Sequence, residues 1–335
     1  MKTCYRESKG EQELLDVSIV MVSYNQAAYL ERALETIYQT IQGLSFEVIV
    51  VDNASTDDTV ERIRFKYPQV KLVENGRNYG FPIAINRGIQ FSRGRYILVL
   101  STDTELLPNS VSAMMRILDS QPSVSAVGCR LMWPDGRTQV SCGPRFYTLL
   151  STFMDSLFVY AIMDRFFPRM DYPGRYAYSP EEHDVEREVE WLSFPCLLVR
   201  REVLDDVGLW DEKIFLYGED WDWCQRARAR GHRLLYTPSA SVVHLQAKPL
   251  GYSTKAGLSY WFDSMAYLFN KRGGRVSGII FLVLRFIGAV VSFLPMLLVY
   301  AIWARKRTQL RKYLDADWNS IVYLSRLLIR ASLAP

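Results

Sequence analysis

The most constraining feature of this 335-residue sequence is an alternation, between residues 17 and 100, of short apolar runs with stretches of helical period. The first run, Val17–Ser23, is continuous and rich in β-branched residues, which is typical of a strand buried on both faces. Leu30, Leu34 and Ile37 then follow at helical spacing. Further strands are expected at 47–51, 70–74 and 96–100, and helices at 58–67 and 82–92. Strands that alternate with helices predict an α/β fold with a mainly parallel central sheet.

Polar residues follow the ends of three of these strands. Asn25, Asp52 and Asp103 each lie just beyond or at the end of a run. In open parallel sheets ligands bind outside the carboxyl ends of the strands. The sequence therefore places these three side chains on one rim, where a binding site is expected.

The second half of the chain is less regular. Residues 145–185 are rich in Phe, Tyr, Met and Pro and have no clear period, so they receive no assignment. From Trp191 the pattern resumes, with helices expected at 201–207 and 221–230, the second ended by Gly231. Strands are expected at 196–199, in a run that ends at Tyr236, and separately near Val242.

Composition and cysteine usage indicate the compartment. The chain is 49% hydrophobic and 23% charged, which is not the composition of a disordered protein. The first sixteen residues contain no apolar run of the kind that a signal peptide needs, so we expect the N-terminus to start in the cytosol. The scattered cysteines form no C-x-x-C pair and are expected to be ordinary core thiols. They are Cys4, Cys129, Cys142, Cys196 and Cys224.

Seven short motifs, in this order, resemble those of the inverting glycosyltransferases of family 2, whose nucleotide-sugar-binding fold is called GT-A. The resemblance runs from about Val17 to His244. The motifs are Val-Ser-Tyr-Asn (22–25), Val-Asp-Asn-Ala-Ser-Thr-Asp (51–57), Asn-Tyr-Gly-Phe with Asn-Arg-Gly (78–88), Asp-Thr-Glu-Leu-Leu-Pro (103–108), Val-Gly-Leu-Trp-Asp (207–211), Tyr-Gly-Glu-Asp-Trp-Asp (217–222) and His244. The apolar tract and the order of the motifs are similar to those of bacterial rhamnosyltransferase-like members of that family.

The resemblance implies a divalent metal, Mn²⁺ or Mg²⁺, held by Asp103 and His244. A nucleotide-diphosphate leaving group builds negative charge that such a cation stabilises, and Mn²⁺ accepts both carboxylate and imidazole ligands. Ser101-Thr102 departs from the family pattern, which commonly has Asn-Pro or an acidic residue there, so the site has one carboxylate rather than two. The alternatives are a turn cap for Asp103 and a structural role for His244.

The Glu219-Asp220 pair resembles the family's Glu-Asp pair, which implies that Asp220 is the catalytic base. Inverting transfer is a direct displacement, so a carboxylate must take the proton of the acceptor hydroxyl. Glu219 and Asp222 are placed on the acceptor side. The alternative is that these acids only stabilise the N-terminus of the following helix, and for Asp222 that structural role is the preferred one.

The donor nucleotide sugar is expected to contact residues of the first four motifs. By the resemblance, Asp52 hydrogen-bonds the base and Tyr24 and Asn25 line the same pocket. Asn78, Gly80 and Asn86 shape the diphosphate pocket, with the glycine letting backbone approach the phosphates. Thr102 completes this set beside Asp103. The alternative for Asp52 and the glycine is an ordinary turn.

The C-terminal region suggests a membrane. Phe286–Ala304 is nineteen residues without a charge, roughly 28 Å as a helix, close to the bilayer core of about 30 Å. Nine basic and no acidic residues lie between Lys271 and Lys312, which leaves the rest of the chain at −5 out of a total of +4. Such a basic block beside apolar sequence indicates an anionic membrane surface. Nucleic-acid binding is the competing interpretation, but these residues border an apolar stretch and are not interleaved with exposed aromatics, so we expect a membrane and no nucleic acid. Positive charge on both flanks favours a re-entrant or interfacial arrangement, broken near Gly288 or Pro295, over a simple span. A buried core helix is the alternative.

These expectations define three regions: an N-terminal extension (1–16), a GT-A glycosyltransferase domain (17–250) and a helical membrane-associating region (251–335). The expected activity is inverting transfer of a sugar, such as rhamnose or another hexose, from a dTDP-, UDP- or GDP-linked donor to a glycan or polyprenyl-linked acceptor, at the cytoplasmic face of the membrane. The alternative is a catalytically inactive membrane-bound scaffold of the same fold. A dehydrogenase would need G-x-G-x-x-G after its first strand, and a nucleotidyltransferase a glycine-rich basic loop; both are absent.

Overall fold

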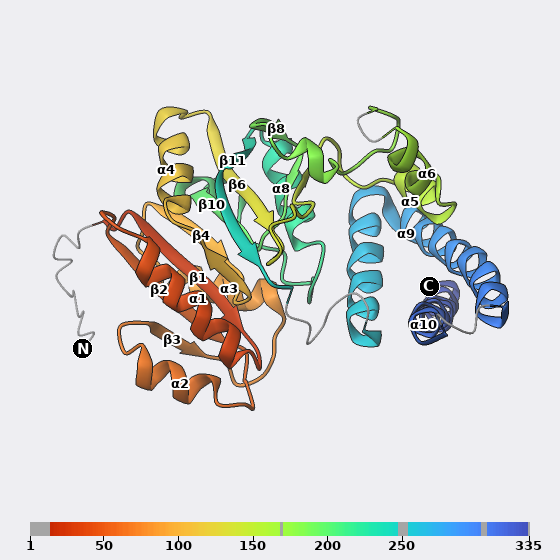
Figure 1. Cartoon of the computed structure of the whole chain (residues 1–335), viewed down its shortest axis with the longest axis horizontal. Helices are drawn as coiled ribbons and strands as arrows, with labels where there is room; N and C mark the ends of the chain where they lie inside the picture. The colour runs from red at the N-terminus through yellow and green to blue at the C-terminus, as the bar shows by residue number, and fades with distance from the viewer. Residues whose placement is uncertain (1–13, 168–169, 247–253, 303–306, 334–335) are drawn as a thin grey trace, which may run out of the picture.

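A nine-stranded sheet forms the centre of the protein in the computed structural model, which describes residues 14–167, 170–246, 254–302 and 307–333 (Figure 1). The first half of the chain follows the expected alternation. Its elements are β1 (Val17–Ser23), α1 (Ala27–Thr40), β2 (Phe46–Asp52), α2 (Thr59–Lys66), β3 (Lys71–Glu74), α3 (Phe81–Gln90), β4 (Tyr96–Leu100), β5 (Thr104–Leu106), α4 (Ser110–Ser120) and β6 (Val124–Met132).

The second half adds shorter elements and then long helices. These are β7 (Cys142–Gly143), α5 (Leu149–Ser156), α6 (Val159–Phe166), the 3₁₀ helix η1 (Pro180–Glu182), β8 (Arg187–Val189), β9 (Trp191–Leu192), β10 (Cys196–Arg200), α7 (Arg201–Val207), α8 (Glu219–Ala229), β11 (Arg233–His244), α9 (Lys255–Ile302) and α10 (Arg307–Leu333). The strand order of the sheet is β3-β2-β1-β4-β10-β6-β11-β5, with β8 beside β11.

The parallel part of the sheet aligns its strand ends. β1 pairs in parallel with both β2 and β4, and in this register Ser23 lies opposite Asp52. The loops that follow these strands therefore leave the sheet at the same edge. The predicted α/β fold with a mainly parallel sheet and a polar rim is confirmed, although β10, β5 and β8 pair antiparallel.

Alternating strand residues bury apolar side chains on both faces of the sheet, as the period of two requires. One face packs against α1, α2 and α4, with Leu34, Ile63 and Met114 in the same core cluster. The other face packs against α3, α7 and α8, with Ile85 and Trp223 in its cluster. The result is a three-layer α/β/α arrangement.

One strand prediction is wrong in its division. The segments ending at Tyr236 and near Val242 belong to a single strand, β11, whose pairing with β6 is interrupted between Thr237 and Ser241. Pro238 lies inside this irregularity; it has no N–H to donate, which explains the local break in the ladder. After the interruption β11 continues as far as His244.

The unassigned region 145–185 contains α5 and α6. Helix α5 lies against the long helix α9, and α6 packs against α5 (Figure 1). Thr148 caps α5 by accepting a hydrogen bond from the Ser151 N–H at 3.1 Å, and the Ser151 hydroxyl reciprocates to the Thr148 N–H at 3.2 Å. This local signal was present in the sequence, hidden in an aromatic-rich stretch.

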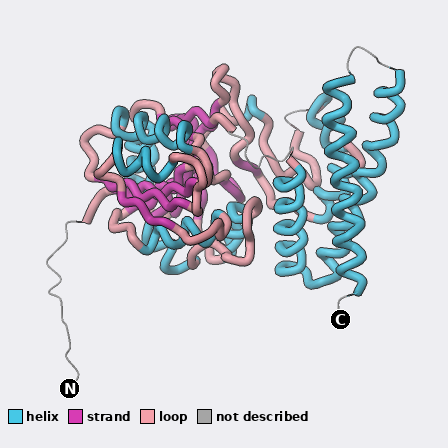
Figure 2. Tube along the Cα trace, turned by 90° about the horizontal axis from the view of Figure 1, so that it is seen from below, coloured by secondary structure: helices cyan, strands magenta, loops and turns pink. Residues whose placement is uncertain are grey.

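The C-terminal helices form a group beside the α/β layers (Figure 2). Within α9 the backbone is non-helical at Gly273 and Gly274, where the helix bends. The predicted break near Gly288 or Pro295 is wrong, because the backbone stays helical through both. The bend uses the positive φ of Gly274, 73°, which a residue with a side chain rarely adopts. α10 packs along the part of α9 that follows this bend. Trp318 lies near Phe293, and the Ala331 carbonyl accepts a hydrogen bond from Arg275.

Two basic residues of this region have acidic partners, as in a helix that packs against the rest of the protein. Lys271 binds both Asp211 and Asp222, and Arg285 binds Asp155 at 2.6 Å. One described segment, Lys255–Phe293, is long and apolar enough to cross a membrane by length and composition. Arg305 and Lys306 lie outside the described residues, as do the predicted boundary at 250 and most of the N-terminal extension. Four cysteines are free and buried, as expected, and Cys4 lies outside the described part.

Candidate active site

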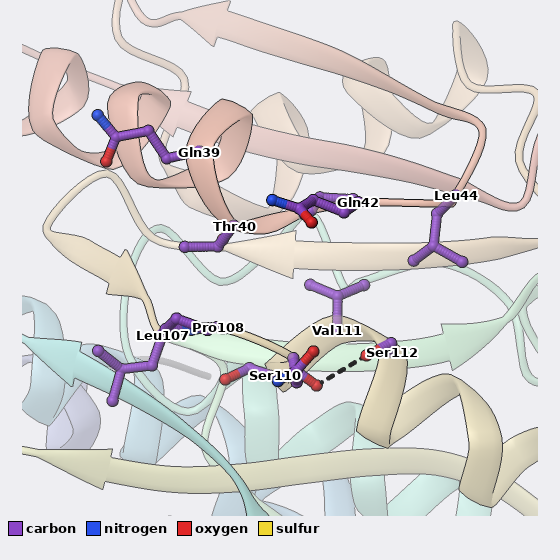
Figure 3. A pocket seen from close by; sticks show the side chains of 11 residues that line it. Gln39, Thr40, Gln42, Leu44, Leu107, Pro108, Ser110, Val111 and Ser112 are labelled. Carbon is purple, nitrogen blue, oxygen red and sulfur yellow. Dashed lines mark hydrogen bonds between the residues drawn. The ribbon is translucent and has the colours of Figure 1, made fainter.

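A cavity of about 970 Å³ opens at the rim where β1 and β4 end. It brings together Asp103, Glu219, Asp220 and His244, which come from separate parts of the chain. Its walls also include residues of α9 and α10, among them Trp261 and Asp317. A smaller pocket of about 240 Å³ lies between the end of α1 and the start of α4 (Figure 3). No charged residue lines it, so it is a poor candidate for chemistry.

Pairing between β5 and β11 places Asp103 beside His244. His244 lies opposite Thr104 in that antiparallel pair, and the Leu245 N–H donates to the Asp103 carbonyl at 2.9 Å. The His244 Nε2 atom is 3.5 Å from Asp103 Oδ1, which also accepts a hydrogen bond from the Ser101 hydroxyl. The two side chains are mostly buried and face the same cavity.

Gln139 fixes the orientation of the His244 ring. Its amide nitrogen donates to the His244 carbonyl at 2.7 Å, so its oxygen, 2.8 Å from His244 Nδ1, must accept the Nδ1 proton. The neutral ring then has its lone pair on Nε2, on the Asp103 side. This is the tautomer and orientation of a metal-binding histidine whose other nitrogen is held by an outer partner.

The residues present fit a divalent cation that receives part of its ligand set from substrate. Among the described residues, no group of three or more His, Cys, Asp and Glu side chains is placed to hold a metal. Asp103 and His244 would supply one carboxylate and one imidazole, and a bound diphosphate would supply further oxygens. Thr102 is one of the two residues that depart from the family pattern. It is buried, and its hydroxyl donates a hydrogen bond to the side-chain oxygen of Gln26.

Glu219 and Asp220 begin α8 directly after Gly218, which has a φ of 85°. Burial, with the neighbouring Asp220 charge as a second cause, raises the pKa of Glu219 to about 8. Burial also raises the pKa of Asp220 to about 6, against the hydrogen bond that it accepts from the Trp221 N–H. One Glu219 oxygen is buried without a partner. Burial thus raises the pKa of both carboxyl groups, and because they are coupled, the pair titrates as a unit that binds protons more readily than two exposed carboxylates.

Tyr217 lies close to both ends of this arrangement. Burial raises the pKa of its hydroxyl to about 12, and the charges of Glu219 and Asp103 raise it further. The same side chain thus experiences the metal-site carboxylate and the acidic pair, which indicates that the two groups share one electrostatic environment.

Asp222 is not on the acceptor side, where it was predicted. It is buried, it does not line the cavity, and its two oxygens bind Arg226 at 2.8 Å and Lys271 at 2.7 Å. Asp222 follows Asp220 by two residues and so points to another side of α8. The structure favours the alternative that the sequence already offered, a structural role at the start of this helix.

Tyr24 lines the cavity, whereas Asn25 and Asp52 do not. The Asn25 side-chain oxygen accepts from the Thr56 N–H at 2.7 Å, and both Asp52 oxygens bind Ser55. Asp52 is only 2% exposed. These residues connect the loops after β1 and β2 and shape the rim; direct contact of Asp52 with a base is not supported by this arrangement.

Asn78 and Gly80 line the cavity, but Asn86 does not. The amide of Asn86 holds the loop before α8, accepting from the Trp210 N–H at 3.0 Å and donating to its carbonyl at 2.9 Å. A Cβ on Gly80 would lie 2.5 Å from the Phe215 carbonyl oxygen. In this structure the close backbone approach at Gly80 is to Phe215, and the predicted placement of Asn86 in the diphosphate pocket is corrected because Asn86 does not line the cavity.

Sequence reasoning missed several parts of the cavity wall. Gln139 gave no signal, because its partner is 105 residues away. Trp221 stacks on Tyr147 with centroids 5.4 Å apart, and the Tyr147 hydroxyl donates to Asp155. Asp155 lies in the region that had no assignment, so its pairing with Arg285 could not be anticipated.

Comparison with known proteins defines the class. Residues 18–208 match the family described as "Glycosyl transferase family 2". This match covers more than half of the chain, so the protein belongs to glycosyl transferase family 2 and is a glycosyltransferase.

Individual relatives agree with this assignment. The chain is 32% identical over 248 residues to the N-acetylglucosaminyl-diphospho-decaprenol L-rhamnosyltransferase of Mycobacterium tuberculosis, covering 70% of this chain and 77% of the relative. It is 28% identical over 230 residues to the succinoglycan biosynthesis protein ExoO of Rhizobium meliloti, covering 68% of this chain and 60% of that protein.

Solved structures show the same GT-A fold. GalNAc-T7 with UDP, GalNAc and Mn²⁺ aligns with a TM-score of 0.54 at 17% identity, over 78% of this chain and 51% of its own. The chain thus spans about half of that structure. The mannosyltransferase PcManGT of Pyrobaculum calidifontis, in complex with GDP-Man and Mn²⁺, aligns with a TM-score of 0.50 at 18% identity, over 92% and 87%.

Proposed function

We propose that this enzyme transfers a sugar, with inversion, from a nucleotide-diphosphate donor to a hydroxyl of a lipid-linked glycan. Residues 17–250 form the catalytic domain in this proposal and residues 251–335 the membrane-associating region. The observation that carries it is a single cavity lined by Asp103, His244 and Asp220. The reaction requires side chains that can bind a metal ion and a base whose pKa is near neutral.

The donor and acceptor occupy different ends of the cavity in this proposal. The donor lies at the rim, beside Tyr24, Asn78 and Thr102. The acceptor enters along the part of the cavity that is lined by α9 and α10, which we call the acceptor arm. Its lining is largely apolar and aromatic, with Trp261, Phe262 and Met265. Such a lining suits the part of an amphipathic acceptor that joins its sugar to a lipid.

The chain's own residues carry the proton chemistry. Asp220 accepts the proton of the acceptor hydroxyl as that oxygen forms its bond to the anomeric carbon and the bond to the donor diphosphate breaks. Glu219, protonated beside it, adds no second negative charge to the site. Asp103 and His244 would hold a divalent cation, which supplies charge stabilisation to the departing diphosphate.

We infer the substrate class from the relatives. One named relative transfers L-rhamnose to a diphospho-decaprenol acceptor, so dTDP-rhamnose is the first donor to test, before UDP- and GDP-hexoses. A polyprenyl-linked acceptor also agrees with the long apolar part of α9. We propose that the enzyme acts at the cytoplasmic face of the cell membrane, and release into the soluble fraction without detergent or high salt would contradict this.

A panel of nucleotide sugars, assayed for hydrolysis or transfer with Mn²⁺, Mg²⁺ or chelator, tests the activity. Asp220→Asn is expected to keep donor binding and to lower turnover by about 10²–10⁴-fold, the contribution of a general base. Asp103→Ala is expected to weaken donor binding in the presence of metal. Asp135→Asn is the matched control, because Asp135 is an exposed partner of Arg137 outside the cavity. No turnover with any donor, together with unchanged donor binding in Asp103→Ala, would favour the inactive scaffold.

A further inference from the structure

Helix α5 has its polar and apolar faces reversed. Its small polar residues Ser151, Thr152 and Ser156 are buried. The large apolar residues Leu150 and Phe153, with Leu157 directly after the helix, are exposed at helical spacing. A helix on the surface of a water-soluble domain normally shows the opposite pattern.

Helix α6 also exposes large apolar side chains at helical spacing. Ile162 and Phe166 are exposed four residues apart, following exposed Phe158, while Tyr160 is buried. Phe166 is 70% exposed. Phe158 connects the two helices with a φ of 58°, a conformation that a bulky residue rarely adopts. The exposed side chains of α5 and α6 together form what we call the α5–α6 face: Leu150, Phe153, Leu157, Phe158, Ile162 and Phe166.

Helix α5 packs with the side opposite to this face against α9, the most apolar helix of the protein. A Cβ on Gly288 of α9 would lie 2.8 Å from Ser156 Cβ, so α5 touches α9 in its apolar stretch through its polar side. Only 22% of the most hydrophobic window of Lys255–Phe293 is buried. α9 has an exposed apolar stripe of its own, formed by Val276, Ile280, Val283, Ile287 and Val291.

We propose that the α5–α6 face docks into the headgroup–acyl boundary of a lipid bilayer, as a second membrane contact beside α9. This rests on the membrane association proposed above. We argue that the occupant is lipid from three observations. Helix α5 packs against α9, a helix of membrane-spanning length and hydropathy, the polar side of α5 is turned toward the protein, and exposed Arg165 lies at the end of α6. Aromatic and aliphatic side chains beside a cationic one are typical of interfacial helices.

The docking would also position the active site. Asp155 of α5 lines the cavity and binds Arg285 of α9, so α5 is a wall of the acceptor arm. A membrane against the outer side of α5 would therefore bring the acceptor arm next to the lipid in which an acceptor is anchored.

Site-specific fluorescence on the full chain tests the docking. Phe153→Cys and Phe166→Cys, each carrying the fluorophore NBD, are compared with Phe65→Cys in a Cys4→Ser background. Phe65 is the matched control, because it is 87% exposed on α2, far from α9. The four described native cysteines are buried and do not compete for the label. The vesicles contain three parts phosphatidylcholine to one part phosphatidylglycerol, with brominated acyl chains for quenching.

On vesicle binding, labels at 153 and 166 are expected to brighten, shift to shorter wavelength and be quenched at a depth of about 5–10 Å below the headgroups. The label at 65 is expected to remain unchanged. Vesicle-bound protein whose three labels behave alike would overturn the proposal. So would labels at 153 and 166 that shift without vesicles as protein concentration rises, since a second copy would then cover the face.

Donor hydrolysis by the same labelled proteins separates the two proposals. Loss of the docking signal with hydrolysis retained contradicts the α5–α6 contact alone. Docking without hydrolysis by the unlabelled enzyme with any donor contradicts the proposed activity and leaves the contact supported.

Discussion

Replacing Gln139 by leucine tests the arrangement on which the metal site depends. Gln139 is 5% exposed and makes two hydrogen bonds to one residue, to the His244 carbonyl at 2.7 Å and to Nδ1 at 2.8 Å. Leucine removes both and leaves the ring free to rotate or to change tautomer. Loss of an outer partner of a metal-binding histidine typically weakens metal affinity by about 10–100-fold. Two lost hydrogen bonds, at about 0.5–1.5 kcal/mol each, also lower the free energy of unfolding by about 1–3 kcal/mol.

The two effects are measured separately. Mn²⁺ affinity is titrated by electron paramagnetic resonance in the presence of a nucleoside diphosphate, and unfolding is followed by urea denaturation. Gln139→Glu is informative, because a carboxylate still accepts from Nδ1 but cannot donate to the carbonyl. It is expected to retain Mn²⁺ binding while losing stability. Gln42→Leu, at the exposed smaller pocket, is the control. Wild-type Mn²⁺ affinity in Gln139→Leu would refute the assignment of Nε2 as a metal ligand.

Three further predictions concern the acidic pair and the glycine that precedes α3. Turnover is expected to fall as pH drops through about 6, because protonation of Asp220 removes the base; Asp220→Asn should lack this limb of the pH–rate profile. The folded state binds the Glu219 proton more tightly than the unfolded state, so its burial opposes folding increasingly from the ordinary pKa of 4.5 up to about 8. The rise in melting temperature caused by Glu219→Gln should therefore be larger at pH 8 than at pH 5, and an equal rise would contradict the shift. Gly80→Ala should lower the free energy of unfolding by about 1–3 kcal/mol, because it places a side chain at a strained φ of 85° and against Phe215. Gly43→Ala, which has open space around it, should cost less in the same denaturation assay.

The first hundred residues could be predicted because their structure is local. The runs at β1, β2 and β4 are continuous and β-branched, and the helices between them have a clear period. Motif order then identified the family, and five of the eight residues predicted to bind the donor line the cavity: Tyr24, Asn78, Gly80, Thr102 and Asp103. Shared cavity placement of Asp103, Asp220 and His244 also followed from the resemblance, although nothing near His244 in sequence indicates it.

The remaining side chains could not be placed because sequence motifs do not give side-chain direction. Asn25, Asp52 and Asn86 occur in the expected motifs, yet their hydrogen-bonding groups are used to hold loops together. Asp222 points away from the cavity because it lies two residues after Asp220 on α8, where its oxygens bind Arg226 and Lys271. Gly288 was read as a point of breakage, but the tertiary contact with Ser156 gives the small residue a packing role instead.

The contribution of α9 and α10 to the cavity has a practical meaning for handling this enzyme. The family match stops at residue 208, so removal of the apolar C-terminal helices α9 and α10 could be chosen to ease purification. Trp261, Phe262, Met265 and Ser320 would go with it, and the floor around Asp220 would lie open to bulk water. We expect a shortened protein to hydrolyse its activated sugar in water. Assays on it would then measure hydrolysis instead of transfer to an acceptor.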